Sequence, residues 1–163
     1  MSQRVKTMMR NYKNMVRERD LLAQEIRSFT GITEAEMIEA MCFHQPKGDR
    51  VQETESHDRM ERIALEFRQQ LERSNRAWLI HLQSRHQELS EEISFFENAI
   101  HSLPEDCAGL MWDFLMAELT WDELEDKYHM GRSSLGIRRK KAIEILDRLY
   151  FSRDKLYAEY VVR

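Results

Sequence analysis

Glycine and proline are scarce in this chain of 163 residues, which contains only five glycines and two prolines. Because these two residues end helices and build tight turns, their scarcity leaves the chain few places to reverse direction. Long runs of β-branched residues, which would indicate strands, are also missing, whereas charged residues make up 33% and methionine is abundant. The composition therefore predicts an all-α protein.

Other features that the sequence lacks narrow its class. No apolar run approaches the roughly 18 residues that a membrane-spanning helix needs, and the first residues do not resemble a signal peptide. The two cysteines, Cys42 and Cys107, lie far apart without the spacing of metal ligands. We therefore expect a cytoplasmic protein with reduced thiols, without a cofactor or metal, and with no membrane contact. We also expect no enzymatic activity, because no motif places a nucleophile beside a base and there is no glycine-rich phosphate loop.

Two stretches of the N-terminal part show helical periodicity. Apolar residues recur at spacings of three and four over 5–29 and again over about 56–103, which is typical of coiled-coil-like helices. Such long helices must cover their apolar stripes, either by folding back on each other or by pairing with another copy of the chain. Cations of the first helix, such as Lys6 and Arg10, could touch DNA or polymerase, although a solvated flank is the simpler interpretation. We predict that residues 1–103 form a helical oligomerisation region.

Residues that end or begin helices divide this N-terminal region. Gly31 marks the end of the first helix, and a capping box at Thr33–Glu36 begins a short helix. Pro46 and Gly48 lie in a polar setting and predict a loop over about 43–56.

The C-terminal part contains a different signal. A capping box at Thr120–Glu123 predicts a short helix with Leu124 on its inner face. The pattern stops at His129–Gly131, where Gly131 can tolerate a positive φ and can act as the N-cap of the next helix. Two helices joined by such a turn form a helix-turn-helix. We therefore predict a DNA-binding domain over 104–163, whose aromatic C-terminal tail continues the last helix and docks on the body or on a partner.

The second helix of this pair is basic where it begins. The first residues of a recognition helix face base edges, and cations further along neutralise phosphates. We assign base contacts to Arg132, Ser133, Gly136 and Ile137, and backbone contacts mainly to Arg139, Lys140 and Lys141, with Ser134 among the DNA-binding residues.

Charge is segregated along the chain, although the net charge is only -4. From Gly131 to the end there are nine Lys or Arg against four acids, whereas 91–130 contains eleven acids against one Lys. Because salt screens exposed charges beyond about 10 Å, a local basic patch rather than the net charge would meet the phosphates of DNA.

The same residues resemble a known family. Leu103-Pro104-Glu105, the segment Leu119–Leu124 and Lys141-Ala142-Ile143 are similar to the promoter-reading C-terminal domain of bacterial sigma factors, and the resemblance runs from 103 to 146 without a gap. With a long helical half before that domain, the chain resembles phage-encoded late-gene activators of the RinA and ArpU type.

The resemblance implies that Arg132, Ser133, Gly136 and Ile137 occupy base-contacting positions and that Lys140 and Lys141 make further DNA contacts. The chain also departs from the family. Glu118 stands where the family usually has a turn glycine, and Gly131 replaces a capping Ser or Thr. Gly136 and Ile137 replace longer polar readers.

These observations lead to one main expectation and two alternatives. We expect a sequence-specific DNA-binding regulator of phage or prophage genes that activates late genes in a bacterial host. It would bind double-stranded DNA as a homo-oligomer and contact RNA polymerase. Alternatively, the domain is a protein-interaction module that binds RNA polymerase or another regulator without reading DNA. A small phage structural or packaging protein is the third class.

Overall fold

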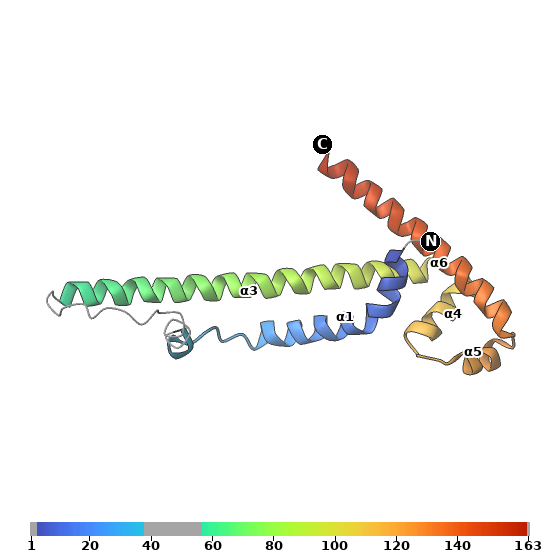
Figure 1. The fold of residues 1–163 in the computed structure, drawn as a ribbon, viewed down its shortest axis with the longest axis horizontal. Coiled ribbons are helices and arrows are strands. Elements are labelled where there is room, and N and C mark those ends of the chain that lie inside the picture. The colour runs from blue at the N-terminus through green and yellow to red at the C-terminus, as the bar shows by residue number, and fades with distance from the viewer. Residues whose placement is uncertain (1–2, 38–56, 163) are drawn as a thin grey trace, which may run out of the picture. The chain divides into compact units, whose positions relative to one another are not determined.

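The computed structural model describes residues 3–37 and 57–162, and all regular structure within these ranges is helical (Figure 1). The all-α prediction is therefore confirmed. The loop predicted over about 43–56 lies outside the described residues, as does Cys42. Within the two described ranges, none of the helices has the length and apolar character needed to cross a membrane. The helices whose bounds lie within the described residues are α1 (Gln3–Arg27), α3 (His57–His101), α4 (Glu105–Leu115), α5 (Trp121–Tyr128) and α6 (Arg132–Val161), and residues 34–37 are also helical.

The chain divides into two compact units, and both α1 and α3 contribute to each of them. One unit, which we call the terminal unit, combines Met1–Glu18 with Leu89–Arg163; the other, the middle unit, is Arg19–Glu88. The division between the units therefore falls inside both α1 and α3. As a result, the first part of α1 belongs to the same unit as α4, α5 and α6.

The core of the terminal unit is built on the end of α3. Leu89, Ile93, Phe96 and Ile100 recur at spacings of three and four and are all buried, as the periodicity predicts. Tyr12 of α1 packs against Phe96 with ring centroids 5.7 Å apart, and its hydroxyl donates a hydrogen bond of 2.5 Å to a carboxylate of the same α3 turn. This packing holds α1 on α3 within the terminal unit.

Helices α4, α5 and α6 form the second part of this core. Leu110 of α4, Leu124 of α5 and Leu135 of α6 are buried together. The predicted capping box is present: Thr120 Oγ1 accepts from the Glu123 amide, and Glu123 Oε2 accepts from the Thr120 amide at 2.7 Å. The start of α5 is therefore fixed by its own sequence.

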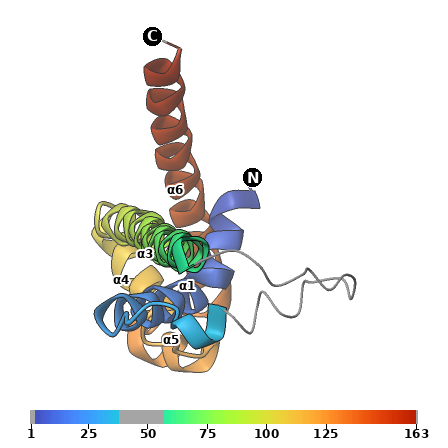
Figure 2. The ribbon, with the colours of Figure 1, turned by 90° about the vertical axis from the view of Figure 1, so that its left-hand side faces the viewer.

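The C-terminal tail continues α6, as predicted, and in both views it extends away from α4 and α5 (Figures 1 and 2). Its first aromatic residue, Tyr150, is buried against Phe95 with ring centroids 4.8 Å apart, so the base of the tail docks as expected. The apolar residues beyond Tyr150 do not. They remain 68–79% exposed, and they are Phe151, Leu156, Tyr157 and Tyr160. Docking on a partner stays a prediction.

The middle unit contains far less apolar burial. Of its described hydrophobic residues, only Leu82 is buried, and Trp78, which the sequence places on the same stripe, is 50% exposed. A pair of hydrogen bonds connects α3 to the segment that follows α1. Asn75 of α3 accepts a hydrogen bond from the Ile32 amide at 2.6 Å and donates one to the Ile32 carbonyl, beside Gly31 with its φ of 80°. The predicted capping box of Thr33 and Glu36 is also formed.

Candidate nucleic-acid interface

The turn between α5 and α6 has the predicted length but a different conformation. His129, not Gly131, is the left-handed residue, with a φ of 50°, and it forms the C-cap of α5. Gly131 has a φ of −66° and caps the start of α6, accepting hydrogen bonds from the Ser134 and Leu135 amides. The predicted N-cap role of Gly131 is thus confirmed. The positive φ that Gly131 could have tolerated falls on His129 instead, because the chain reverses at the end of α5.

Most of the residues assigned to DNA binding lie on the exposed surface at the start of α6. Arg132, Ser133, Ser134, Ile137, Lys140 and Lys141 are exposed, and Gly136 is half-buried. Ser133, Ile137 and Lys140 follow one another at spacings of four and three and so share one helix face. Ile137 is 71% exposed, so its aliphatic side chain is available on this face. A Cβ added at Gly136 would meet no atom within 4 Å, so this face is open.

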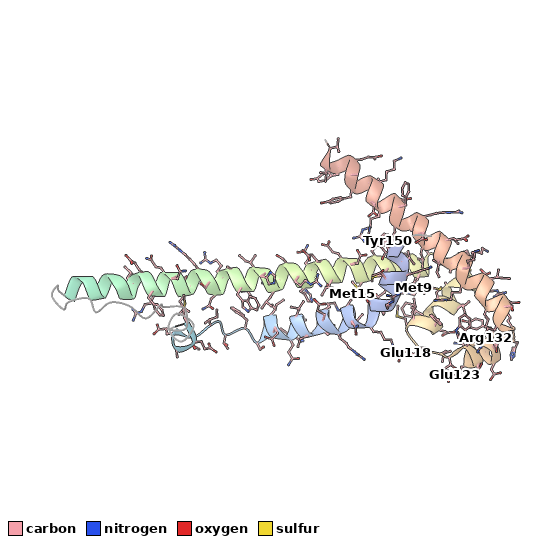
Figure 3. All side chains as sticks on the ribbon, viewed as in Figure 1. Met9, Met15, Glu118, Glu123, Arg132 and Tyr150 are labelled. Atoms are coloured by element: carbon pink, nitrogen blue, oxygen red, sulfur yellow. The ribbon has the colours of Figure 1, made fainter. Side chains whose placement is uncertain are left out.

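Arg132 begins α6 at the corner where α5 and α6 meet (Figure 3). Its Nη2 lies 2.8 Å from Asp122 Oδ1, and its guanidinium lies 6.0 Å from the Trp121 ring centroid. Both partners of the ion pair are exposed, and such pairs contribute at most about 1 kcal/mol. The pair therefore positions the guanidinium at the surface without preventing it from binding another acceptor.

Arg139 is placed differently from the other cations. Its guanidinium stacks over Phe114 of α4 at 4.7 Å and lies 5.9 Å from the Trp121 ring centroid. Its Nε is buried with no hydrogen-bond partner among the described residues, and burial lowers the pKa of the Arg139 side chain. The sequence contained a signal for this inward position, because Arg139 falls four residues after Leu135 and three before Ala142, on the buried face of α6.

A buried carboxylate links α4 to α5 beneath the turn. Asp113 is 9% exposed, and it accepts hydrogen bonds from the Tyr128 hydroxyl at 2.7 Å and from Lys127 Nζ at 2.6 Å. Burial opposes ionisation of Asp113, but these two donors outweigh it and hold its pKa below the usual value. Burial and the adjacent carboxylate raise the pKa of Tyr128 to about 12. The sequence analysis missed this link, since a buried acid carries no periodic signal.

In chemical terms, the start of α6 offers cations, hydroxyls and one aliphatic side chain on a helix that α4 and α5 hold in place. Among the described residues, no group of His, Cys, Asp and Glu side chains is arranged to hold a metal ion. No protein-family model, curated protein or solved structure matches the chain. The resemblance to sigma factors and to phage activators therefore stays a prediction.

Proposed function

We propose that the terminal unit binds double-stranded DNA by placing the start of α6 in the major groove. The observation that carries this proposal is the open face of Ser133, Ile137 and Lys140, beside a glycine that has space around it. The major groove admits an α-helix whose first residues contact base edges, and cations further along the helix reach the flanking phosphates. The packed core beneath α5 and α6 supplies the rigid support that base recognition needs.

Each exposed residue has a role in this mechanism. The Ile137 side chain makes apolar contact with a thymine methyl group, and the Ser133 hydroxyl donates to or accepts from a base edge. The Arg132 guanidinium leaves Asp122 to bind guanine or a phosphate. Lys140 and Lys141 neutralise phosphates and so contribute affinity without sequence preference.

We further propose that the protein regulates transcription of phage or prophage genes and activates late genes, as its resemblance implies, in contact with the polymerase of a bacterial host. A single small recognition helix binds weakly, so two linked copies would raise affinity through effective concentration. The exposed apolar side chains of the middle unit, such as Leu65 and Trp78, support pairing with another copy of the chain.

The proposal is tested by fluorescence anisotropy of the full chain with DNA from upstream of its own gene and from the neighbouring late operon, at several salt concentrations. We expect tighter binding than to scrambled DNA. Each phosphate contact contributes a slope of roughly −0.9 in log K against log salt. Replacing both Lys140 and Lys141 by Gln should make the slope shallower by roughly 1.8, whereas Ile137→Ala should reduce discrimination and leave the slope unchanged. Absence of binding at low salt would contradict the proposal.

The protein-interaction module is a second candidate, because one observation favours it. The last turns of α6 expose Phe151, Leu156 and Tyr157 on a helix that projects from the terminal unit. Such a surface fits an apolar groove on polymerase or on another regulator. Binding through it would show little salt dependence, so the slope of the same titration with the partner separates the two functions.

A further inference from the structure

An open cavity of about 540 Å³ lies beside the candidate recognition face, inside the terminal unit. Helices α1, α4 and α6 all contribute to it, and Figure 3 labels one of its lining residues, Met9 of α1. Four of its lining residues are cations and none is a carboxylate; the cations are Lys6, Arg10, Arg139 and Lys140. Apolar residues form the rest of the wall, namely Met9, Phe114, Leu115 and Ile143, together with Gly136. The charge of this lining would therefore favour an anion over a cation.

The cations of α1 differ in how their charge is balanced. Arg4 pairs with Asp154 at 2.5 Å, and Lys13 pairs with Glu118. Lys6 and Arg10, by contrast, are exposed, and no carboxylate in the described part of the chain pairs with either. They are four residues apart, so their side chains leave α1 on the same side.

Arg139 adds a third charge that lacks an anion. Its guanidinium rests on an aromatic ring, and its buried Nε has no acceptor among the described residues. A half-buried cation is costly unless a negative charge approaches it. A phosphate in the cavity would supply that charge.

The position of the cavity shows which phosphate it would receive. Gly136 and Lys140 belong both to its lining and to the open part of α6 assigned to DNA. The cavity thus lies at the edge of the recognition face, where one strand of the DNA would pass when α6 occupies the major groove. Gly136 has no side chain, so the strand can approach the helix backbone closely.

We propose that this cavity binds a phosphate group of the DNA backbone and that Lys6 and Arg10 of α1 contribute two phosphate contacts. The inference rests on the proposed DNA-binding function. It assigns to the first helix a direct role in DNA binding, in addition to its packing on α3.

The test compares full-length variants by anisotropy on the duplex that the wild-type protein binds most tightly. The double variant Lys6→Gln/Arg10→Gln should make the salt slope shallower by roughly 1.8, since each lost phosphate contact removes roughly 0.9. The conservative exchange Lys6→Arg/Arg10→Lys should keep the slope. The matched control is Arg73→Gln/Arg76→Gln on α3, which removes the same charge from the middle unit and should leave the slope unchanged. Circular dichroism checks that each variant is folded.

Three outcomes would contradict the inference or its premise. An unchanged slope in Lys6→Gln/Arg10→Gln, with normal binding by the wild type and a loss in Lys140→Gln/Lys141→Gln, would overturn this inference and leave the proposed function standing. An equal loss of slope in the middle-unit control would assign the effect to total charge and would also overturn it. A wild-type protein that does not bind DNA at any salt concentration would instead overturn the proposed function.

Discussion

The terminal and middle units share the apolar stripe of α3 but differ in how deeply they bury it. In the terminal unit, apolar residues of α3 such as Ile93 and Phe96 are completely buried. In the middle unit, Phe67 and Leu71 continue the same periodic stripe on the same helix, yet they are only half-buried. The difference lies in what surrounds the helix, because α1, α4 and α6 all contribute to the core of the terminal unit.

This comparison shows that an apolar stripe predicts a surface that needs covering but not what covers it. The middle unit leaves Leu65 and Ile80 more than half exposed, in addition to Trp78. Contiguous exposed apolar patches are typical of surfaces that pair with another protein chain, whereas single exposed apolar residues are common on any protein surface. A second copy of the chain remains our expectation for that role.

The largest expected effect is the loss of a core leucine. Leu124 is completely buried between α4 and α6, so Leu124→Ala should lower the free energy of unfolding by about 3 kcal/mol. The matched substitution Leu65→Ala changes a side chain that is 56% exposed, and should cost less than about 0.5 kcal/mol in dilute solution. Urea unfolding followed by circular dichroism measures both. A large and concentration-dependent loss in Leu65→Ala would show instead that another copy covers this residue.

The link between α4 and α5 should be weaker but sensitive to pH. Tyr128→Phe removes the hydroxyl that donates to Asp113, and a hydrogen bond to a charged acceptor contributes about 2 kcal/mol. Since the folded pKa of Asp113 is below the unfolded value of about 3.9, the stabilisation from its ionised form is present above that pH and is lost as pH falls through the folded pKa.

The difference between wild type and Tyr128→Phe should therefore shrink in acid. At high pH the titrating group is Tyr128 itself. Its pKa is raised to about 12 from an unfolded value of about 10, so the stabilisation from the neutral phenol is lost as pH rises between these values. Urea unfolding over a series of pH values measures both limits. A difference that stays constant from neutral pH to pH 3 would contradict the role of the Asp113 carboxylate.

A substitution at Gly31 tests the middle unit separately. Gly31 has a φ of 80°, and a Cβ there would lie 2.8 Å from the Asn75 amide nitrogen. Gly31→Ala should therefore cost about 1 to 2 kcal/mol, with the left-handed backbone as the main cause. Hydrogen exchange should increase in Arg19–Glu88 and not in the terminal unit. Gly31→Asn, which tolerates this conformation better, should cost less, and equal losses in both variants would assign the effect to the contact with Asn75.

The sequence predicted those parts of the fold that depend on local signals. Thr120 and Glu123 cap α5 as their spacing requires, and the buried spacing of Leu89 to Ile100 follows from helix geometry. It did not predict that α1 joins the terminal unit, because packing between distant segments leaves no mark on the periodicity of either one.

Parts of the candidate site were missed for the same reason. The sequence indicated that Lys6 and Arg10 form a solvated flank, whereas in the structure they line a cavity together with Arg139. Nothing in the sequence indicated that Asp113 is buried. The inward position of Arg139 could have been predicted from its spacing on the inner face of α6. The run of four consecutive basic residues suggested instead that all four were exposed. The left-handed backbone conformation occurs at His129, which ends α5, although Gly131 two residues later was the obvious candidate from the sequence.

The smallest expected effect on stability separates folding from function at Gly136. Unlike Leu124, this position has room for a larger side chain, because an added Cβ would meet no atom within 4 Å. Alanine is preferred to glycine inside a helix by about 0.5 to 1 kcal/mol. Gly136→Ala should therefore raise the free energy of unfolding by that amount and yet weaken DNA binding, because the added methyl group stands between α6 and the DNA. Ser152→Ala, an exposed position further along α6, provides the control that should gain helix stability with no change in binding. Stabilising the helix cannot by itself weaken its contacts, so weaker binding by Gly136→Ala alone would be due to the added methyl group. If Gly136→Ala bound DNA as tightly as the wild type, the DNA would lie elsewhere and close approach at this face would be excluded.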